Sequence, residues 1–338
     1  LCFSAMPSDH INPVSSPKTI FVTSFHPLIS RNIIATPIVR LLREAHCRVV
    51  ILVPNYKRQY FEERYGAPGV VVEGIETGAS IRTTRVGMFK RLAEATPPTE
   101  RAAIGRKRTL SGKMKSPFYY YLFYAPAGFL GRFLWFHRLA RFLDHLLSPR
   151  GRFRTLIEHY QPSLVFATDV QNENDVACMQ DARRAGVRVI AMVRSWDNPT
   201  TRALRFVPDT LLVHNNVIKE EVVTLYGIDP RIVSVVGIPH YDKYIGRKPL
   251  AREAFLKSLG ADPAKPLILY IPLCDYRMTK NNVDRYVMEV LGSLDATIVV
   301  RFPPAETVSI EGYNKTDNVI FDRPGHVFQE HAVGDRDL

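Results

Sequence analysis

Short, uninterrupted runs of apolar and β-branched residues recur along this chain, and they constrain its fold more than any other feature. A strand with one face in water alternates apolar and polar residues, whereas a strand covered on both faces is apolar throughout. Helical patterns separate the runs, and this alternation predicts a doubly wound α/β domain with a parallel sheet. The predicted strands are 19–23, 49–53, 69–73, 164–168, 187–193, 210–214 and 232–236.

Two of the intervening helices are well marked. Residues 31–45 place their apolar side chains on one helical face, and Thr36 and Pro37 are suited to be the N-cap and the first helical residue. Thr36 and Pro37 therefore indicate that the helix begins later than its apolar pattern alone suggests. Residues 172–186 predict a second helix, which ends at Gly186 before the next strand.

After residue 240 the pattern starts again, so the 338 residues are expected to form two domains. Apolar strands at 266–271, 296–301 and 318–321 predict a second Rossmann-like unit, although such a unit usually has about five or six strands. We therefore expect this unit to be incomplete and the chain to be cut short. The predicted division is a flexible N-terminal tail (1–17), a Rossmann-like domain (18–240) and a partial second Rossmann-like domain (241–338).

Cysteine usage and missing motifs narrow the class of protein. The four cysteines lie far apart without a CxxC spacing, which argues against a zinc site or a disulfide framework and favours a reducing compartment. No secretory signal pattern precedes Met6, so a cytoplasmic location is predicted. Neither GxGxxG nor GxxxxGKS is present, which argues against a dinucleotide dehydrogenase and a P-loop ATPase.

Polar loops follow three of the predicted strands. Because ligands of doubly wound folds bind beyond the carboxyl ends of parallel strands, these loops are expected to meet at one edge and to form a site. The candidate residues are His26 and Arg31 in the first loop, Asp169 in the second, and Arg194, Trp196, Asp197 and Asn198 in the third.

Three segments carry a resemblance to a known family: "MVRSWDNPTT" (192–201), "PDTLLVHNNVIKEEVVTLYGI" (208–228) and "VVGIPHYDKY" (235–244). With them the chain resembles a bacterial family of GT-B-fold glycosyltransferase-like proteins. These are related in layout to CDP-glycerol glycerophosphotransferases and to non-hydrolysing UDP-N-acetylglucosamine 2-epimerases. The resemblance covers roughly residues 19–325, and it departs from the family at "RFPP" (301–304), where Arg-x-His-Pro is usual. It implies an N-terminal domain that binds the acceptor and a C-terminal domain that binds the nucleotide-activated donor.

The resemblance also implies roles for the first two loops. His26 stands where such enzymes carry the acceptor base, because an imidazole can take a hydroxyl proton near neutral pH; the alternative is a histidine that only caps the next helix or bonds backbone. Arg31 opens a helix and could bind a phosphate, or be merely solvated. Asp169 is the second catalytic candidate, whereas Glu173 and Asp175 are better explained as caps of the following helix.

The third loop is interpreted as acceptor-binding. Arg194, Asp197 and Asn198 can hydrogen-bond sugar hydroxyls or phosphate, and the indole of Trp196 can stack on a pyranose. The alternative is that Asp197 only braces the loop by pairing with Arg194 or Arg202. In the second domain, the candidates for donor binding are Tyr276, Arg277 and Arg301.

The net charge of +12 is concentrated in residues 101–154, which contain twelve Lys and Arg, twelve aromatic residues and a single acid, Asp144. Its uncharged stretch, 118–131, is too short to cross a bilayer. Basic residues beside Trp, Tyr and Phe are typical of a segment lying on an anionic membrane. Single-stranded nucleic acid is the less favoured partner of this segment. The structural alternative is a buried helix pair with a solvated basic loop.

Together these features predict a transferase that moves a sugar, or a polyol phosphate, from a nucleotide-activated donor to a glycan or lipid-linked acceptor. It would act peripherally at the inner face of the membrane, in cell-envelope glycan synthesis. No metal and no cofactor beyond the donor substrate are expected, since cations and helix dipoles can stabilise the departing diphosphate. The alternatives are a sugar-nucleotide epimerase and a non-catalytic scaffold that binds nucleic acid or membrane.

Overall fold

The structure is a computed structural model that describes residues 17–26, 30–77, 84–111, 117–246, 248–272, 283–302, 316–322, 326–327 and 336–337. The predicted flexible tail, residues 1–17, lies outside the described residues except for Pro17.

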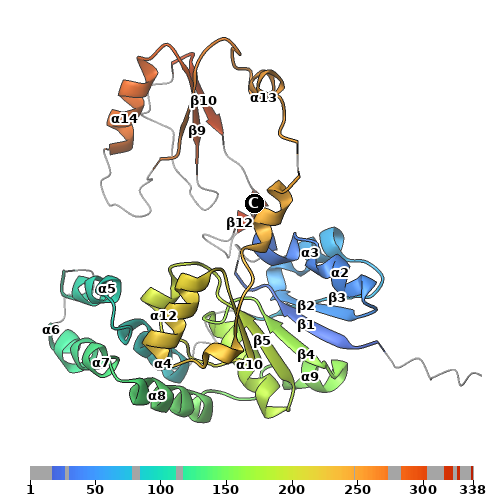
Figure 1. Cartoon of the computed structure of the whole chain (residues 1–338), viewed down its shortest axis with the longest axis vertical. Coiled ribbons are helices and arrows are strands. Elements are labelled where there is room, and N and C mark those ends of the chain that lie inside the picture. The colour runs from blue at the N-terminus through green and yellow to red at the C-terminus, as the bar shows by residue number, and fades with distance from the viewer. Residues whose placement is uncertain are drawn as a thin grey trace, which may run out of the picture.

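The larger sheet has seven strands in the order β3-β2-β1-β4-β5-β6-β7, and every pairing in it is parallel (Figure 1). Strand order therefore reverses between β1 and β4, which are neighbours although 140 residues separate their ends. The strands are β1 (Thr19–Thr23), β2 (Arg48–Pro54), β3 (Val70–Ile75), β4 (Leu164–Ala167), β5 (Arg188–Met192), β6 (Thr210–Val213) and β7 (Val233–Val235).

A second parallel sheet has the order β10-β9-β8 and contains β8 (Leu267–Tyr270), β9 (Thr297–Arg301) and β10 (Val319–Asp322). Its helices are α13 (Arg252–Ser258) and α14 (Val283–Gly292), shown in orange in Figure 1. A two-residue antiparallel pair joins β11 (His326–Val327) to β12 (Arg336–Asp337).

Helices cover both faces of the larger sheet, as the apolar strands require. Side chains that alternate along one strand enter different cores: Phe21 and Val50 pack on one face, while Ile20, Val22 and Val49 pack on the other. The helical segments are η1 (Ser30–Ile34), α2 (Ile38–Glu44), η2 (Asn55–Lys57), α3 (Arg58–Tyr65), α9 (Arg154–Tyr160), α10 (Glu173–Arg184), α11 (Asn198–Thr201), α12 (Asn216–Tyr226), η5 (Pro230–Ile232) and η6 (Pro239–Tyr244).

The basic aromatic segment folds as a helical layer between β3 and β4, drawn in teal and green in Figure 1. Its elements are α4 (Thr84–Ala95), α5 (Glu100–Ser111), α6 (Pro117–Tyr119), η4 (Tyr120–Tyr124), α7 (Ala125–Leu130) and α8 (Leu134–Leu147). One side of α8 packs on α12, where the rings of His137 and Tyr226 meet edge to face at 5.1 Å. Buried His137 accordingly has a lowered pKa, chiefly because burial disfavours its charged form.

The prediction of two parallel α/β units is confirmed, and each predicted strand lies within two residues of an observed one. The helix predicted over 31–45 is instead divided into η1 and α2. The break falls at Pro37, which has no N–H to donate to the Ile33 carbonyl. The hydroxyl of Thr36 donates to Ile33 O at 2.6 Å instead, and it accepts from Ile38 N at 3.5 Å. Pro37 occupies the N-cap position of α2, one residue from where it was expected.

Candidate functional site

The candidate site begins at the switch point between β1 and β4, where two threonines tie the strand ends together. Thr168 donates its backbone N–H to Thr23 Oγ1 at 2.9 Å, and its hydroxyl donates to the Thr23 carbonyl at 2.7 Å. Both residues are fully buried. Crossover helices leave this point toward opposite faces, which is where doubly wound folds bind ligands beyond the strand ends.

Two buried carboxylates lie directly behind this edge. Asp169 accepts from Arg194 Nη1 at 2.7 Å and from the backbone N–H of Gln171 at 3.1 Å. Asp175 accepts a hydrogen bond from the hydroxyl of Thr23. Burial raises the pKa of Asp175 well above its usual value, and the neighbouring charge of Asp169 raises it further. The surroundings of Asp175 therefore favour its neutral form, while the carboxylate of Asp169 pairs with Arg194.

His26 follows β1 and lies in the electrostatic field of two cations. Burial lowers its pKa to about 3, with further lowering by Arg194 and then by Lys57. Lys57, at the end of η2 beyond β2, is almost fully buried. The imidazole is therefore neutral at physiological pH. An anion bound near these cations would offset their charge and raise the pKa of His26, which would strengthen it as a base.

The segment 194–198 is firmly attached at its ends. Asp197 pairs with Arg101 of α5 at 2.9 Å, and the carbonyl of Asn198 accepts from Gln171 Nε2 at 3.3 Å. Asn198 is buried, whereas Trp196, which lies between the paired side chains of Arg194 and Asp197, is 67% exposed. The indole is thus a large apolar surface offered at the carboxyl edge of the sheet.

The alternative partners considered for Asp197 are wrong. Arg194 pairs with Asp169, and Arg202 pairs with Glu94 of α4 at 2.8 Å. The bracing role of Asp197 is real, but it joins the loop to α5 and not to a neighbouring arginine.

Other predicted site residues are placed only in part. The backbone of Arg31 belongs to η1, but its side chain is outside the described residues, as are Tyr276 and Arg277. Arg301 ends β9 and pairs with Asp322, at the end of β10, over 2.8 Å. The N-cap of α10 is Asn172, whose side chain accepts from the backbone N–H of Asn174. The interpretation of Asp175 as a cap is wrong, because its side chain turns inward to Thr23.

Three residues of this region were not singled out from the sequence: Lys57, Arg101 and Gln171. Lys57 follows a predicted strand, so the same rule that selected His26 could have found it. Arg101 and Gln171 could not be found this way, since their contacts join segments that are distant in sequence. Among the described residues, no group of three or more His, Cys, Asp and Glu side chains is placed to hold a metal ion.

Comparison with known proteins gives similarity in structure only. No protein-family model matches this chain, and no curated protein matches it in sequence. A protein from Listeria monocytogenes assigned as a UDP-N-acetylglucosamine 2-epimerase is 12% identical; the match covers 91% of this chain and 69% of that one, with a TM-score of 0.51. A second UDP-N-acetylglucosamine 2-epimerase is 12% identical, with 93% and 70% coverage and a TM-score of 0.49. A glycosyltransferase from Rickettsia africae is 11% identical, with 90% and 68% coverage and a TM-score of 0.42.

These structural neighbours are a glycosyltransferase and two UDP-N-acetylglucosamine 2-epimerases, and the sequence resemblance named both kinds of protein. The chain therefore has the GT-B-type layout, with one seven-stranded and one smaller parallel sheet. At such low identity the likeness defines the fold, and the activity has to be argued from the site.

Proposed function

We propose that this protein transfers a sugar, or a polyol phosphate, from a nucleotide-activated donor to a glycan or lipid-linked acceptor. The observation that carries the proposal is the neutral His26 beside Arg194 and Lys57 at the switch point. A neutral imidazole can accept a proton, and the two cations favour an anionic group next to it.

In the proposed reaction, the acceptor hydroxyl gives its proton to His26 while its oxygen attacks the anomeric carbon of the donor. The bond from that carbon to the nucleoside diphosphate breaks, and the diphosphate leaves with the electron pair. Arg194, held by Asp169, stabilises negative charge at this edge of the sheet. Asp169 is buried against Arg194, so we propose that it acts by positioning this guanidinium. Its prediction as a base is left to experiment.

We propose that the second α/β unit supplies the donor site, with Tyr276, Arg277 and Arg301 as the candidate contacts. Trp196, Asp197 and Asn198 would hold the acceptor, since an exposed indole can stack on a sugar ring. The chemistry needs no metal or further cofactor in this proposal, because guanidinium groups can stabilise the departing diphosphate.

The proposal also places the protein at the inner face of an anionic membrane through residues 101–154. Five aromatic side chains of this segment are more than half exposed: Phe118, Tyr121, Phe129, Trp135 and Phe142. Trp135, Leu139, Phe142 and Leu146 repeat at helical spacing along α8, and exposed Arg138 lies among them. In the part of the chain that the structure describes, no helix has the length and apolar character to cross a bilayer.

Sugar-nucleotide epimerisation is the second candidate, because the Listeria protein, which matches with a TM-score of 0.51, is assigned as an epimerase. The two functions differ in what they release. A transferase liberates a nucleotide only when an acceptor is present, whereas an epimerase inverts a sugar centre without an acceptor.

The test is an incubation of the protein with nucleotide-activated sugars, with and without membrane lipid extract or glycan acceptors. Acceptor-dependent nucleotide release is expected, and His26→Gln should lower it by roughly a hundredfold or more. His159→Gln, at an exposed histidine of α9, is the matched control and should keep the activity. Full activity of His26→Gln would exclude His26 as the base, and acceptor-independent inversion would favour the epimerase.

A further inference from the structure

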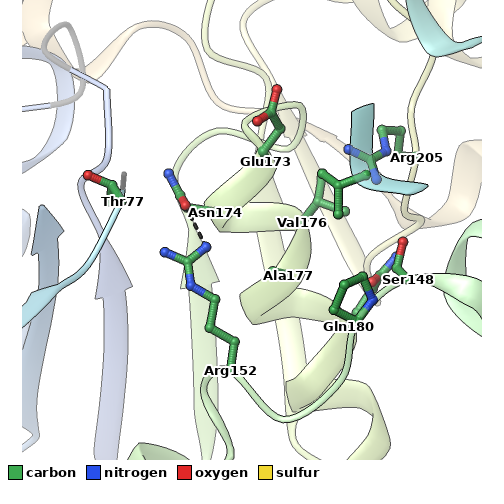
Figure 2. A pocket seen from close by; sticks show the side chains of 11 residues that line it. Thr77, Ser148, Arg152, Glu173, Asn174, Val176, Ala177, Gln180 and Arg205 are labelled. Atoms are coloured by element: carbon green, nitrogen blue, oxygen red, sulfur yellow. Dashed lines mark hydrogen bonds between the residues drawn. The ribbon is translucent and has the colours of Figure 1, made fainter. Parts of the chain in front are cut away.

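A cavity lies beside α10, on a different side of that helix from Asp175 and the candidate site. It is bounded by α10, by α4 and by the connection from α8 to α9, and it has a volume of about 80 Å³ (Figure 2). Since a water molecule needs roughly 10–15 Å³ of this kind of space, the cavity can hold a small group of about five heavy atoms.

Two buried donors in its wall are not used by the protein. Gln180 Nε2 and Arg205 Nη1 have no hydrogen-bond partner among the described residues, and both side chains are at least nine-tenths buried. Arg205 directs its other nitrogens to Asp144, with Nε at 2.7 Å and Nη2 at 3.0 Å. A buried N–H without an acceptor has lost the hydrogen bond that it makes to water in the unfolded chain, so a group that accepts hydrogen bonds is favoured here.

The charge around the cavity favours an anion. Arg152 lines it and forms no ion pair with the described residues; its Nη1 donates to Asn174 Oδ1 at 2.6 Å, and its Nη2 donates to the Glu76 carbonyl. Burial lowers the pKa of Arg152. The one carboxylate in the lining, Glu173, is balanced by Lys90 at 2.5 Å. Figure 2 shows Arg152 and Arg205 on two sides of the cavity, with Val176 and Ala177 of α10 between them.

We propose that this cavity binds a phosphate group, held by Gln180 Nε2 and Arg205 Nη1 and attracted by Arg152. Phosphate oxygens only accept hydrogen bonds at this kind of site, so they match a wall that offers unused donors. The site is separate from His26 and its neighbours and does not depend on the function proposed for them.

Binding of inorganic phosphate tests the proposal, measured by calorimetry and by thermal shift against chloride at equal ionic strength. The wild type is expected to bind phosphate and to melt at a higher temperature in its presence. Gln180→Met keeps the length of the side chain and removes the donor, so it should weaken binding by roughly tenfold or more. Arg205 is avoided as a test, because its loss would leave Asp144 buried without a partner.

Two controls locate the binding. Gln59→Met, at an exposed glutamine of α3, should bind phosphate as the wild type does. His26→Gln should also retain binding, because His26 does not line this cavity. If His26→Gln abolishes the binding and Gln180→Met does not, the phosphate site is at the switch point and the proposal is wrong. If phosphate does not bind, the two donors are satisfied by water, which also overturns it. If a phosphorylated sugar binds more tightly than inorganic phosphate, the natural phosphate group belongs to a small metabolite. If only phospholipid headgroups bind more tightly, it belongs to a lipid.

Discussion

Arg194 donates to Asp169 over 2.7 Å, and this contact joins the loop after β5 to the buried end of β4. Asp169 is fully enclosed, while Arg194 keeps about a fifth of its side chain exposed. The pair thus fixes one cation at the edge of the sheet where the strand order reverses, and it leaves part of that cation accessible to a ligand.

Removing the carboxylate charge should destabilise the protein. Asp169→Asn leaves Arg194 partly buried without its counter-charge, so the free energy of unfolding should fall by on the order of 3 kcal/mol. Adding Arg194→Met should cost less than the sum of the two single changes, because the uncompensated charge disappears. Urea denaturation of the four proteins measures this coupling. Strictly additive effects would show that the two residues do not stabilise each other.

The pair between Asp197 and Arg101 should contribute little to stability. Both side chains are accessible, 28% and 52% exposed, and such pairs are worth less than about 1 kcal/mol. Asp197→Asn should therefore shift the melting temperature by less than about 3 °C, while acceptor-dependent transfer falls. Glu44→Gln, which breaks the exposed pair with Arg40, is the matched control for stability. Unchanged transfer would make Asp197 a brace only, and a large fall in melting temperature would make it a structural residue.

The contribution of His26 to stability should decline as the pH falls from about 6.5 toward 3. The pKa of His26 is lowered to about 3 in the folded state, whereas an unfolded histidine titrates near 6.5. Between these values the unfolded chain binds more protons, so acid favours unfolding and stability rises with pH. His26→Gln should make this dependence shallower in urea denaturation at a series of pH values. His214, whose pKa is also lowered by burial, contributes in the same direction and will leave part of the slope. An identical slope in wild type and variant would show that His26 titrates normally.

The basic aromatic segment, residues 101–154, should bind anionic vesicles, and added salt should weaken this binding. The basic residues of 101–154 supply an attraction that screening reduces, and the exposed rings of Trp135 and Phe142 supply apolar burial. The double variant Trp135→Ala/Phe142→Ala should co-sediment several-fold less with phosphatidylserine-containing vesicles. Its stability should change little.

Tyr286→Ala removes a comparably exposed aromatic ring from α14 and serves as the control for vesicle binding. Equal binding to neutral vesicles would contradict the electrostatic part of the proposal. If the protein retains single-stranded nucleic acid at physiological salt and does not bind vesicles, the partner of residues 101–154 is nucleic acid and not a membrane.

The sequence predicted the larger sheet well because its central strands are buried on both faces, and such burial leaves a continuous apolar signal. The strands β7 and β8 carry the same signal although Val235 and Leu269 are exposed. The sequence also predicted that the loops carrying His26, Asp169 and Arg194 would meet, since parallel strands share an edge. The contacts between side chains could not be predicted from the sequence. Arg101 lies 96 residues from Asp197, and nothing local to either residue specifies that contact. The cavity beside Gln180 was missed for the same reason, because its walls come from separate segments.

The buried pair of Asp144 and Arg205 has a mechanical consequence if the protein acts on a membrane surface, as proposed above. Asp144 belongs to α8, and Arg205 lies in the connection that leads from α11 to β6. A hydrogen bond from Arg141 to the Tyr226 carbonyl adds a second attachment on the same helix. With two such attachments α8 cannot rotate independently of the sheet. If its aromatic side settles on a bilayer, the tilt of the entire larger sheet is set at the same moment, and Trp196 stands at one fixed height above the lipid.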